Sequence, residues 1–150
     1  AAPRATLLLC GCCMRMRGER AAGHMRLRAQ GFACPIGGGR PLSSYVALMS
    51  GAKFVWSPRG HGWSNHRDWE ALVAGAVPVL DHHASFEALY RELPSVHVRD
   101  WANVTPAFLE AEWARIEREA ARFNMNKLYW PYWLGRFTQW MGAASADSPG

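Results

Sequence analysis

Short apolar runs alternate with stretches of helical periodicity along this chain. Runs with the length and composition of β-strands lie at residues 6–10, 53–57, 77–81 and 96–98. The first run is continuously apolar, which predicts a strand buried on both faces. Pro78 near the start of the third run predicts an edge strand or an entry position. Residues 32–34 form a further candidate short strand within a glycine-rich stretch.

The segments between these runs predict helices. Helical patterns cover residues 18–30, 43–49, 66–74, 85–93 and 106–123, and an aromatic segment follows at 129–140. Side chains able to cap a first helical turn precede most of these patterns: Ser43 or Ser44, Asn65, Ser85 and Thr105. In the helix at 66–74 we expect an apolar face and a polar face. The apolar face holds Trp69, Leu72, Val73 and Ala76, and the polar face holds His66, Arg67 and Glu70.

Strands that alternate with helices predict an α/β fold. We expect a Rossmann-like, mostly parallel sheet of about four to six strands with helices on both faces. The sequence predicts one domain over residues 1–141 and a disordered tail over 142–150. Residue 1 does not resemble a natural start, so we expect the chain to belong to a longer protein.

Composition and charge exclude few classes of protein. The 150 residues carry a net charge of +5, but the basic residues are scattered, which disfavours nucleic-acid binding. No run approaches the roughly 20 apolar residues that a membrane span needs. The cysteines are Cys10, Cys12, Cys13 and Cys34. We interpret them as small buried side chains rather than zinc ligands, because a second paired element is missing.

The most informative segment is the loop at residues 57–65, which joins an apolar strand to a helix start. Backbone N–H groups and the positive end of a helix dipole meet at such a junction, where they bind anions. Arg59 and Arg67 add positive charge with a fork that suits phosphate. Asn65 and His66 stand at the helix start, and Glu70 could accept hydrogen bonds from sugar hydroxyls. The plainer alternatives are a surface pair between Arg67 and Glu70 and a solvent-facing His66.

Several motifs around this loop resemble those of exostosin-like glycosyltransferases. They are Phe54-Val55-Trp56-Ser57, Pro58-Arg59-Gly60, His66-Arg67, Trp69-Glu70-Ala71-Leu72, Gly75 and Val77-Pro78-Val79, followed by Leu93-Pro94 and Asp100-Trp101. The resemblance covers residues 45–105 well and residues 6–137 loosely. It implies the C-terminal, donor-binding half of a two-domain GT-B architecture.

The resemblance also assigns roles to individual residues. By it, Arg67 binds the diphosphate and Glu70 binds the ribose of the donor. The same comparison places Arg59, Gly60 and Gly62 in the donor loop, with Arg20 as a further donor-binding arginine. His61 stands where Asn is common, and Ser64 stands where an acidic residue is common. The second departure favours an alternative, a non-catalytic nucleotide- or glycan-binding domain that kept the fold.

The implied activity is transfer of a sugar from a nucleoside diphosphate sugar to a glycan or other hydroxyl acceptor. No metal and no cofactor are expected beyond the nucleotide sugar as co-substrate. The catalytic base would come from a missing N-terminal domain of the same protein, and the aromatic segment at 129–140 would cross to that domain. Core packing and a membrane-surface helix are the alternatives for this segment. Localisation in the Golgi lumen is expected from the family alone. A dinucleotide-dependent enzyme is disfavoured, since no Gly-x-Gly-x-x-Gly follows the first strand.

Overall fold

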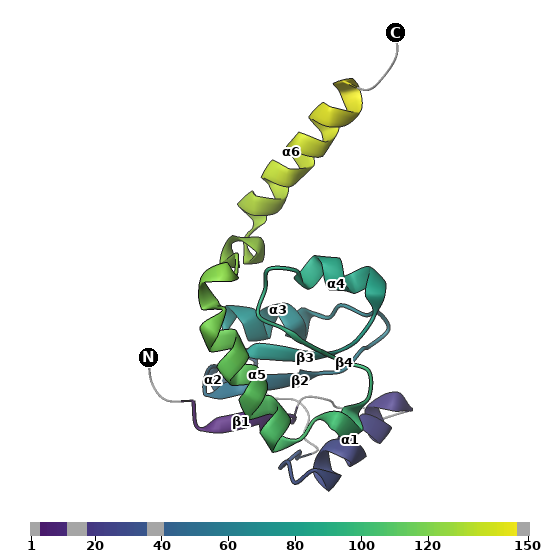
Figure 1. Cartoon of the computed structure of the whole chain (residues 1–150), viewed down its shortest axis with the longest axis vertical. Coiled ribbons are helices and arrows are strands. Elements are labelled where there is room, and N and C mark those ends of the chain that lie inside the picture. The colour runs from purple at the N-terminus through teal and green to yellow at the C-terminus, as the bar shows by residue number, and fades with distance from the viewer. Residues whose placement is uncertain (1–3, 12–17, 36–40, 147–150) are drawn as a thin grey trace.

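The computed structural model describes residues 4–11, 18–35 and 41–146, with side chains through residue 141. Its centre is a four-stranded, wholly parallel sheet in the order β1-β2-β3-β4. The strands are β1 (Thr6–Leu9), β2 (Ala52–Ser57), β3 (Val77–Asp81) and β4 (Val96–Val98). The predicted α/β class and parallel sheet are therefore confirmed, as Figure 1 shows.

Six α-helices and three short 3-10 turns complete the described chain. The α-helices are α1 (Glu19–Ala29), α2 (Leu42–Ser50), α3 (His66–Val73), α4 (Ala84–Tyr90), α5 (Pro106–Arg118) and α6 (Trp130–Ala146). The 3-10 turns are η1 (Trp101–Asn103), η2 (Ala120–Arg122) and η3 (Met125–Leu128). Within the described residues the sheet order never reverses, so the candidate site is located by a strand end rather than by a topological switch point.

The sheet is covered on both faces, as the sequence predicted. Alternate side chains of β2 point to opposite sides. Phe54 and Trp56 belong to the larger core, together with residues of α1 and α5. Val55 belongs to the smaller core, which includes Met49 of α2 and Ala71 of α3. The large aromatic side chains of β2 thus anchor one helical layer, and smaller side chains allow close packing of the other.

Two expectations for the strands are wrong, those for residues 6–10 and 32–34, and the two alternatives for Pro78 are decided. The run at 6–10 forms an edge of the described sheet, so Thr6 is exposed and only part of β1 is buried. Pro78 lies in β3 between two neighbours, opposite Val55, which makes it an entry position and not an edge. Residues 32–34 form no strand, because the chain there continues from α1 without pairing to the sheet.

Two of the predicted helix caps are wrong and two are confirmed. The N-cap of α2 is Pro41 rather than a serine, and that of α4 is His83 rather than Ser85. Both helices begin one or two residues before the predicted hydroxyl, which therefore lies inside the first turn. Asn65 is the N-cap of α3, and the Thr105 hydroxyl accepts from the backbone N–H of Phe108 at 3.1 Å.

The C-terminal elements separate into a packed part and a projecting part. In α5 the apolar side chains Leu109 and Ile116 are buried, and Trp113 meets Phe54 edge to face. Helix α6 then leaves the body of the molecule (Figure 1), and Trp130, Phe137 and Trp140 are at least half exposed. Core packing is therefore the wrong interpretation for this segment.

Helix α6 is longer than the sequence predicted. Helix α6 continues to Ala146, so residues 142–146 are helical rather than a disordered tail, and residues 147–150 lie outside the described part. No helix among the described residues is long and apolar enough to cross a membrane.

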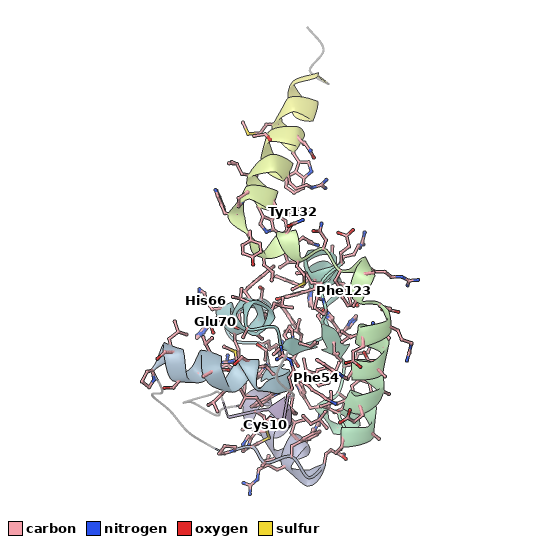
Figure 2. The ribbon with its side chains drawn as sticks, turned by 90° about the vertical axis from the view of Figure 1, so that its left-hand side faces the viewer. Cys10, Phe54, His66, Glu70, Phe123 and Tyr132 are labelled. Atoms are coloured by element: carbon pink, nitrogen blue, oxygen red, sulfur yellow. A yellow bond between two sulfur atoms is a disulfide. The ribbon has the colours of Figure 1, made fainter. Side chains whose placement is uncertain are left out.

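A disulfide joins Cys10, just after β1, to Cys34, beyond α1. Both side chains are buried, as expected for the cysteines, but their bond was not predicted. Figure 2 places Cys10 at the end of the molecule opposite α6. Cys12 and Cys13 lie outside the described residues. The disulfide fixes the segment after α1 to the same sheet end from which the loop at 57–65 departs.

Candidate functional site

The loop at residues 57–65 leaves the carboxyl end of β2, and a carboxylate of the neighbouring strand holds its beginning. Asp81 at the end of β3 accepts the backbone N–H of Arg59 at 2.7 Å. The other oxygen of Asp81 accepts from the indole N–H of Trp101 at 2.8 Å. Trp101 in turn packs edge to face on Trp56. The start of the loop is therefore tied to the larger core through one strand-end carboxylate.

A second, fully buried carboxylate holds the end of the loop. Asp68 in the first turn of α3 accepts the backbone N–H of Asn65 at 2.7 Å, as in a capping box. It also accepts from the Tyr90 hydroxyl at 2.6 Å and from the Ser57 hydroxyl. Burial raises the pKa of Asp68, while these hydrogen bonds and the charge of Arg67 oppose that rise. One carboxylate thus joins β2, the loop end, α3 and α4.

The Tyr90 hydroxyl extends this network toward the surface. It lies 3.0 Å from the Ser64 hydroxyl, which also accepts the Trp69 indole N–H at 3.3 Å. The rings of Trp69 and Tyr90 stack with centroids 5.7 Å apart. Burial, followed by the bond to Asp68, raises the pKa of Tyr90, so its hydroxyl remains a donor at neutral pH. Trp69 is half-buried at this site and is not the core residue that the helical pattern predicted.

Helix α1 contacts the middle of the loop from the other side. The guanidinium of Arg20 donates through Nε to the carbonyl oxygen of Arg59 at 2.9 Å. A Cβ atom on Gly60 would lie 2.7 Å from both Arg20 Nη2 and Asn65 Oδ1. Only glycine fits between these two side chains without moving them. The predicted glycine of the loop therefore has a specific reason, the close approach of an arginine from α1.

These contacts surround an open pocket of about 440 Å³ above the loop. Its lining includes five of the residues that the sequence indicated, Arg20, Gly60, Gly62, Asn65 and His66, and adds His61, Ser64 and Trp69. A concave site with a few convergent polar groups is the usual form of a small-molecule site. Arg20, which only the resemblance indicated, is thus on the pocket wall together with the loop.

The other three predicted site residues lie outside the pocket lining. Arg59 forms an ion pair with Glu19 and covers the Trp63 ring at 4.7 Å, so its side chain braces the loop outside the pocket lining. Arg67 and Glu70 are partly exposed on α3 and are not part of the lining. Figure 2 shows His66 and Glu70 on the same side of α3.

The residues that build the site were mostly missed from the sequence. Asp68 follows Asn65 by three positions, which is a capping-box spacing and was the available signal. Asp81 ends a predicted strand at the correct edge, a weaker signal. Tyr90 lies within a predicted helix, and its hydroxyl partners have no sequence signature because they lie 22 and 26 residues away.

The histidines beside the loop make structural contacts. His82 lies 2.8 Å from a Glu87 carboxylate oxygen, and the His83 ring packs on Trp63 with centroids 4.2 Å apart. Within residues 4–11, 18–35 and 41–146, no group of three or more His, Cys, Asp or Glu side chains could hold a metal ion. The polar groups of the pocket are the side chains of an arginine, two histidines, an asparagine and a serine, the indole N–H of Trp69 and the loop backbone.

Asp68 predicts a pH dependence of stability. A carboxyl group with a higher pKa in the folded protein binds its proton more tightly there, so stability falls as pH rises. The loss of stability occurs in a pH window that begins at 3.8, the pKa of an aspartate in the unfolded chain, and extends up to the higher pKa of Asp68 in the folded protein. We expect the free energy of unfolding of the wild type, relative to Asp68→Asn, to decrease across it in urea titrations. A difference that grows with pH would contradict the assignment.

No protein-family model matches this chain, and no curated protein is similar enough to count as a match. The family that the sequence motifs indicate is therefore a proposal. The chemistry of the pocket has to be inferred from its own residues.

Proposed function

We propose that this chain is the donor-binding domain of a glycosyltransferase with a GT-B architecture, and that the pocket binds a nucleoside diphosphate sugar. The observation that carries the proposal is the convergence of Arg20, the Gly60–Gly62 loop and the start of α3 on one pocket. This pocket lies beyond the carboxyl end of β2, where parallel α/β sheets bind ligands. The motif resemblance supports the same conclusion independently.

The pocket suits the diphosphate part of such a donor. Arg20 supplies a guanidinium, and the first turn of α3 supplies backbone N–H groups at the positive end of the helix dipole. The loop is held by Asp81 at Arg59 and by Asp68 at Asn65. A preorganised loop binds an anion without the entropic cost of ordering itself.

The proposed role in transfer is charge stabilisation at the leaving group. When the bond between the sugar and the diphosphate breaks, negative charge develops on the departing oxygen, and fixed cationic groups lower that barrier. Arg20 on the pocket wall is the candidate that the geometry supports. Arg67 for the diphosphate and Glu70 for the ribose hydroxyls lie on α3 outside the lining, and they are candidates through the motif resemblance alone. We assign no catalytic base, because the proposal places it on a second domain.

A second candidate is a binding domain that does not transfer sugar. The specific observation for it concerns Ser64, which stands where the family commonly has an acidic residue. Its hydroxyl is used by Tyr90 and Trp69 within a structural network. Arg59 is likewise engaged by Glu19 and Trp63. Two positions of the donor loop thus serve the architecture of the loop here.

Replacing Arg20 tests the proposed site directly. We expect Arg20→Ala to weaken binding of UDP or GDP by about 1.5–3 kcal/mol, the range for hydrogen bonds to a charged group, which is at least about tenfold. The measurement is isothermal titration calorimetry. The matched control is Arg26→Ala on the same helix, whose side chain pairs with Asp100 away from the pocket. Equal affinities of the two variants would contradict the proposal.

Further titrations separate the alternatives. NAD should bind much more weakly than UDP or GDP, and a chelator should leave the affinity unchanged. Glu70→Gln should weaken nucleoside diphosphate binding but not pyrophosphate binding, if Glu70 contacts the ribose. Donor binding without sugar transfer by the full-length protein would favour the non-catalytic alternative.

A further inference from the structure

A second pocket of about 360 Å³ lies at the base of α6, and aromatic side chains dominate it. Its walls include Trp69, Tyr129, Trp130 and Trp133, with Leu89 of α4 and Leu128 of η3. Tyr129 and Trp130 are the most exposed of these side chains, at 61% and 69%. Figure 1 shows α6 leaving the body beyond the end of α5, and the pocket lining joins its base to α3 through Trp69 and to α4 through Leu89.

Three polar groups among the lining residues are engaged by the protein, while the Tyr129 hydroxyl and the Trp130 indole N–H belong to exposed side chains. The indole N–H of Trp133 donates to the backbone oxygen of Lys127 at 2.8 Å, and that of Trp69 donates to Ser64. The Lys127 ammonium donates to the carbonyl oxygen of Arg91 and lies 3.9 Å from Glu92. Lys127 is buried, and the Arg91 carbonyl oxygen and the Glu92 carboxylate compensate its charge. The walls therefore offer mainly ring faces and aliphatic carbon, which suit a neutral and flat ligand.

The two pockets share one wall. Trp69 lines the apolar pocket at the base of α6 and also the pocket above the Gly60–Gly62 loop. Its ring is fixed by stacking on Tyr90 and by the hydrogen bond to Ser64. A ligand in the apolar pocket would thus lie one indole ring away from a ligand in the first pocket.

From this juxtaposition we propose that the apolar pocket binds a neutral, flat apolar group of a small molecule. Identifying that group as the apolar part of a hydroxyl-bearing acceptor rests on the proposed donor function. The acceptor class is then an aromatic or otherwise apolar alcohol, rather than an unmodified oligosaccharide or a charged substrate. Its hydroxyl end would extend past Trp69 toward the donor.

The test uses N-phenyl-1-naphthylamine, a neutral apolar dye that fluoresces when it leaves water. We expect the wild-type chain to bind it, and Leu89→Arg to weaken binding at least about tenfold, because a charge would enter an apolar wall. Tyr129→Ala, a substitution at an exposed position that should fold normally, should weaken it about three- to tenfold through loss of ring contact. Circular dichroism checks that each variant is folded.

The matched control is Leu134→Arg, which places the same charge on α6 outside the pocket, at a half-exposed position. Its affinity should stay within about twofold of wild type. Equal losses in Leu89→Arg and Leu134→Arg would mean that the dye binds the exposed α6 surface, and the proposal would be overturned. Parallel titration with UDP keeps the two proposals separate. If the chain does not bind UDP but binds the dye in a way that depends on Leu89, the donor function is refuted and the apolar site is supported.

Discussion

Asp68→Ala is expected to lower the free energy of unfolding by about 3–5 kcal/mol, because it removes the acceptor of three hydrogen bonds at a fully buried position. The Ser57 hydroxyl, the Asn65 N–H and the Tyr90 hydroxyl would each lose a partner. Urea denaturation followed by circular dichroism measures the change. The loop end would also be released, so binding of nucleoside diphosphates should weaken in the same variant.

Two controls show whether this network is responsible. Tyr90→Phe removes one of the three donors and should cost less, about 1–2 kcal/mol. Glu110→Ala removes a carboxylate from an exposed pair with Lys53 and should change stability by at most about 1 kcal/mol. If Asp68→Ala proved no more costly than Glu110→Ala, the network would not be what holds the loop.

The elements of the fold were predictable because each has a local cause. Runs such as Phe54 to Trp56 are apolar over strand length, and Thr105 with Pro106 marks a helix start. The covering of both sheet faces follows from the alternation of strands and helices. It was harder to predict which strand lies at the edge of the sheet, since the burial of β1 depends on which strands pair with it. That pairing is a property of the whole sheet.

The site was predictable in its position but not in its construction. The glycine loop after β2 and the Asn65 cap indicated where the pocket lies. The contacts that shape it join residues far apart in sequence, such as Arg20 and Arg59, separated by 39 positions. Helical periodicity assigned Trp69 to the core and Asp68 to no role. The pattern of one helix cannot reveal that the hydroxyls of Tyr90 and Ser57 lie within hydrogen-bond distance of Asp68.

Helix α1 connects the pocket to the disulfide, a relation visible only in the structure. Arg20 and Glu19 at its start contact the loop, and buried His24 one turn later donates through Nε2 to the carbonyl oxygen of Cys34 at 2.8 Å. The His24 ring also lies near Trp56 of β2, with centroids 6.0 Å apart. The Cys10–Cys34 bond thus fixes the segment against which α1 is held. We infer that the position of Arg20 depends on this bond.

Replacing both cysteines, Cys10→Ala with Cys34→Ala, is therefore expected to affect stability and binding together. The bond closes a loop between residues 24 positions apart, and release of such a loop costs about 3 kcal/mol through the entropy of the unfolded chain. Urea denaturation should show this loss, and calorimetry should show weaker binding of UDP or GDP because α1 is less firmly held. A phosphine reductant should destabilise the wild type by a similar amount but leave the double variant unchanged, which separates the disulfide from other effects of the substitutions. If the double variant is as stable as the oxidised wild type, the bond contributes nothing to the stability of the fold. If the double variant is destabilised but binds nucleotide with unchanged affinity, α1 is held by His24 and its other contacts alone.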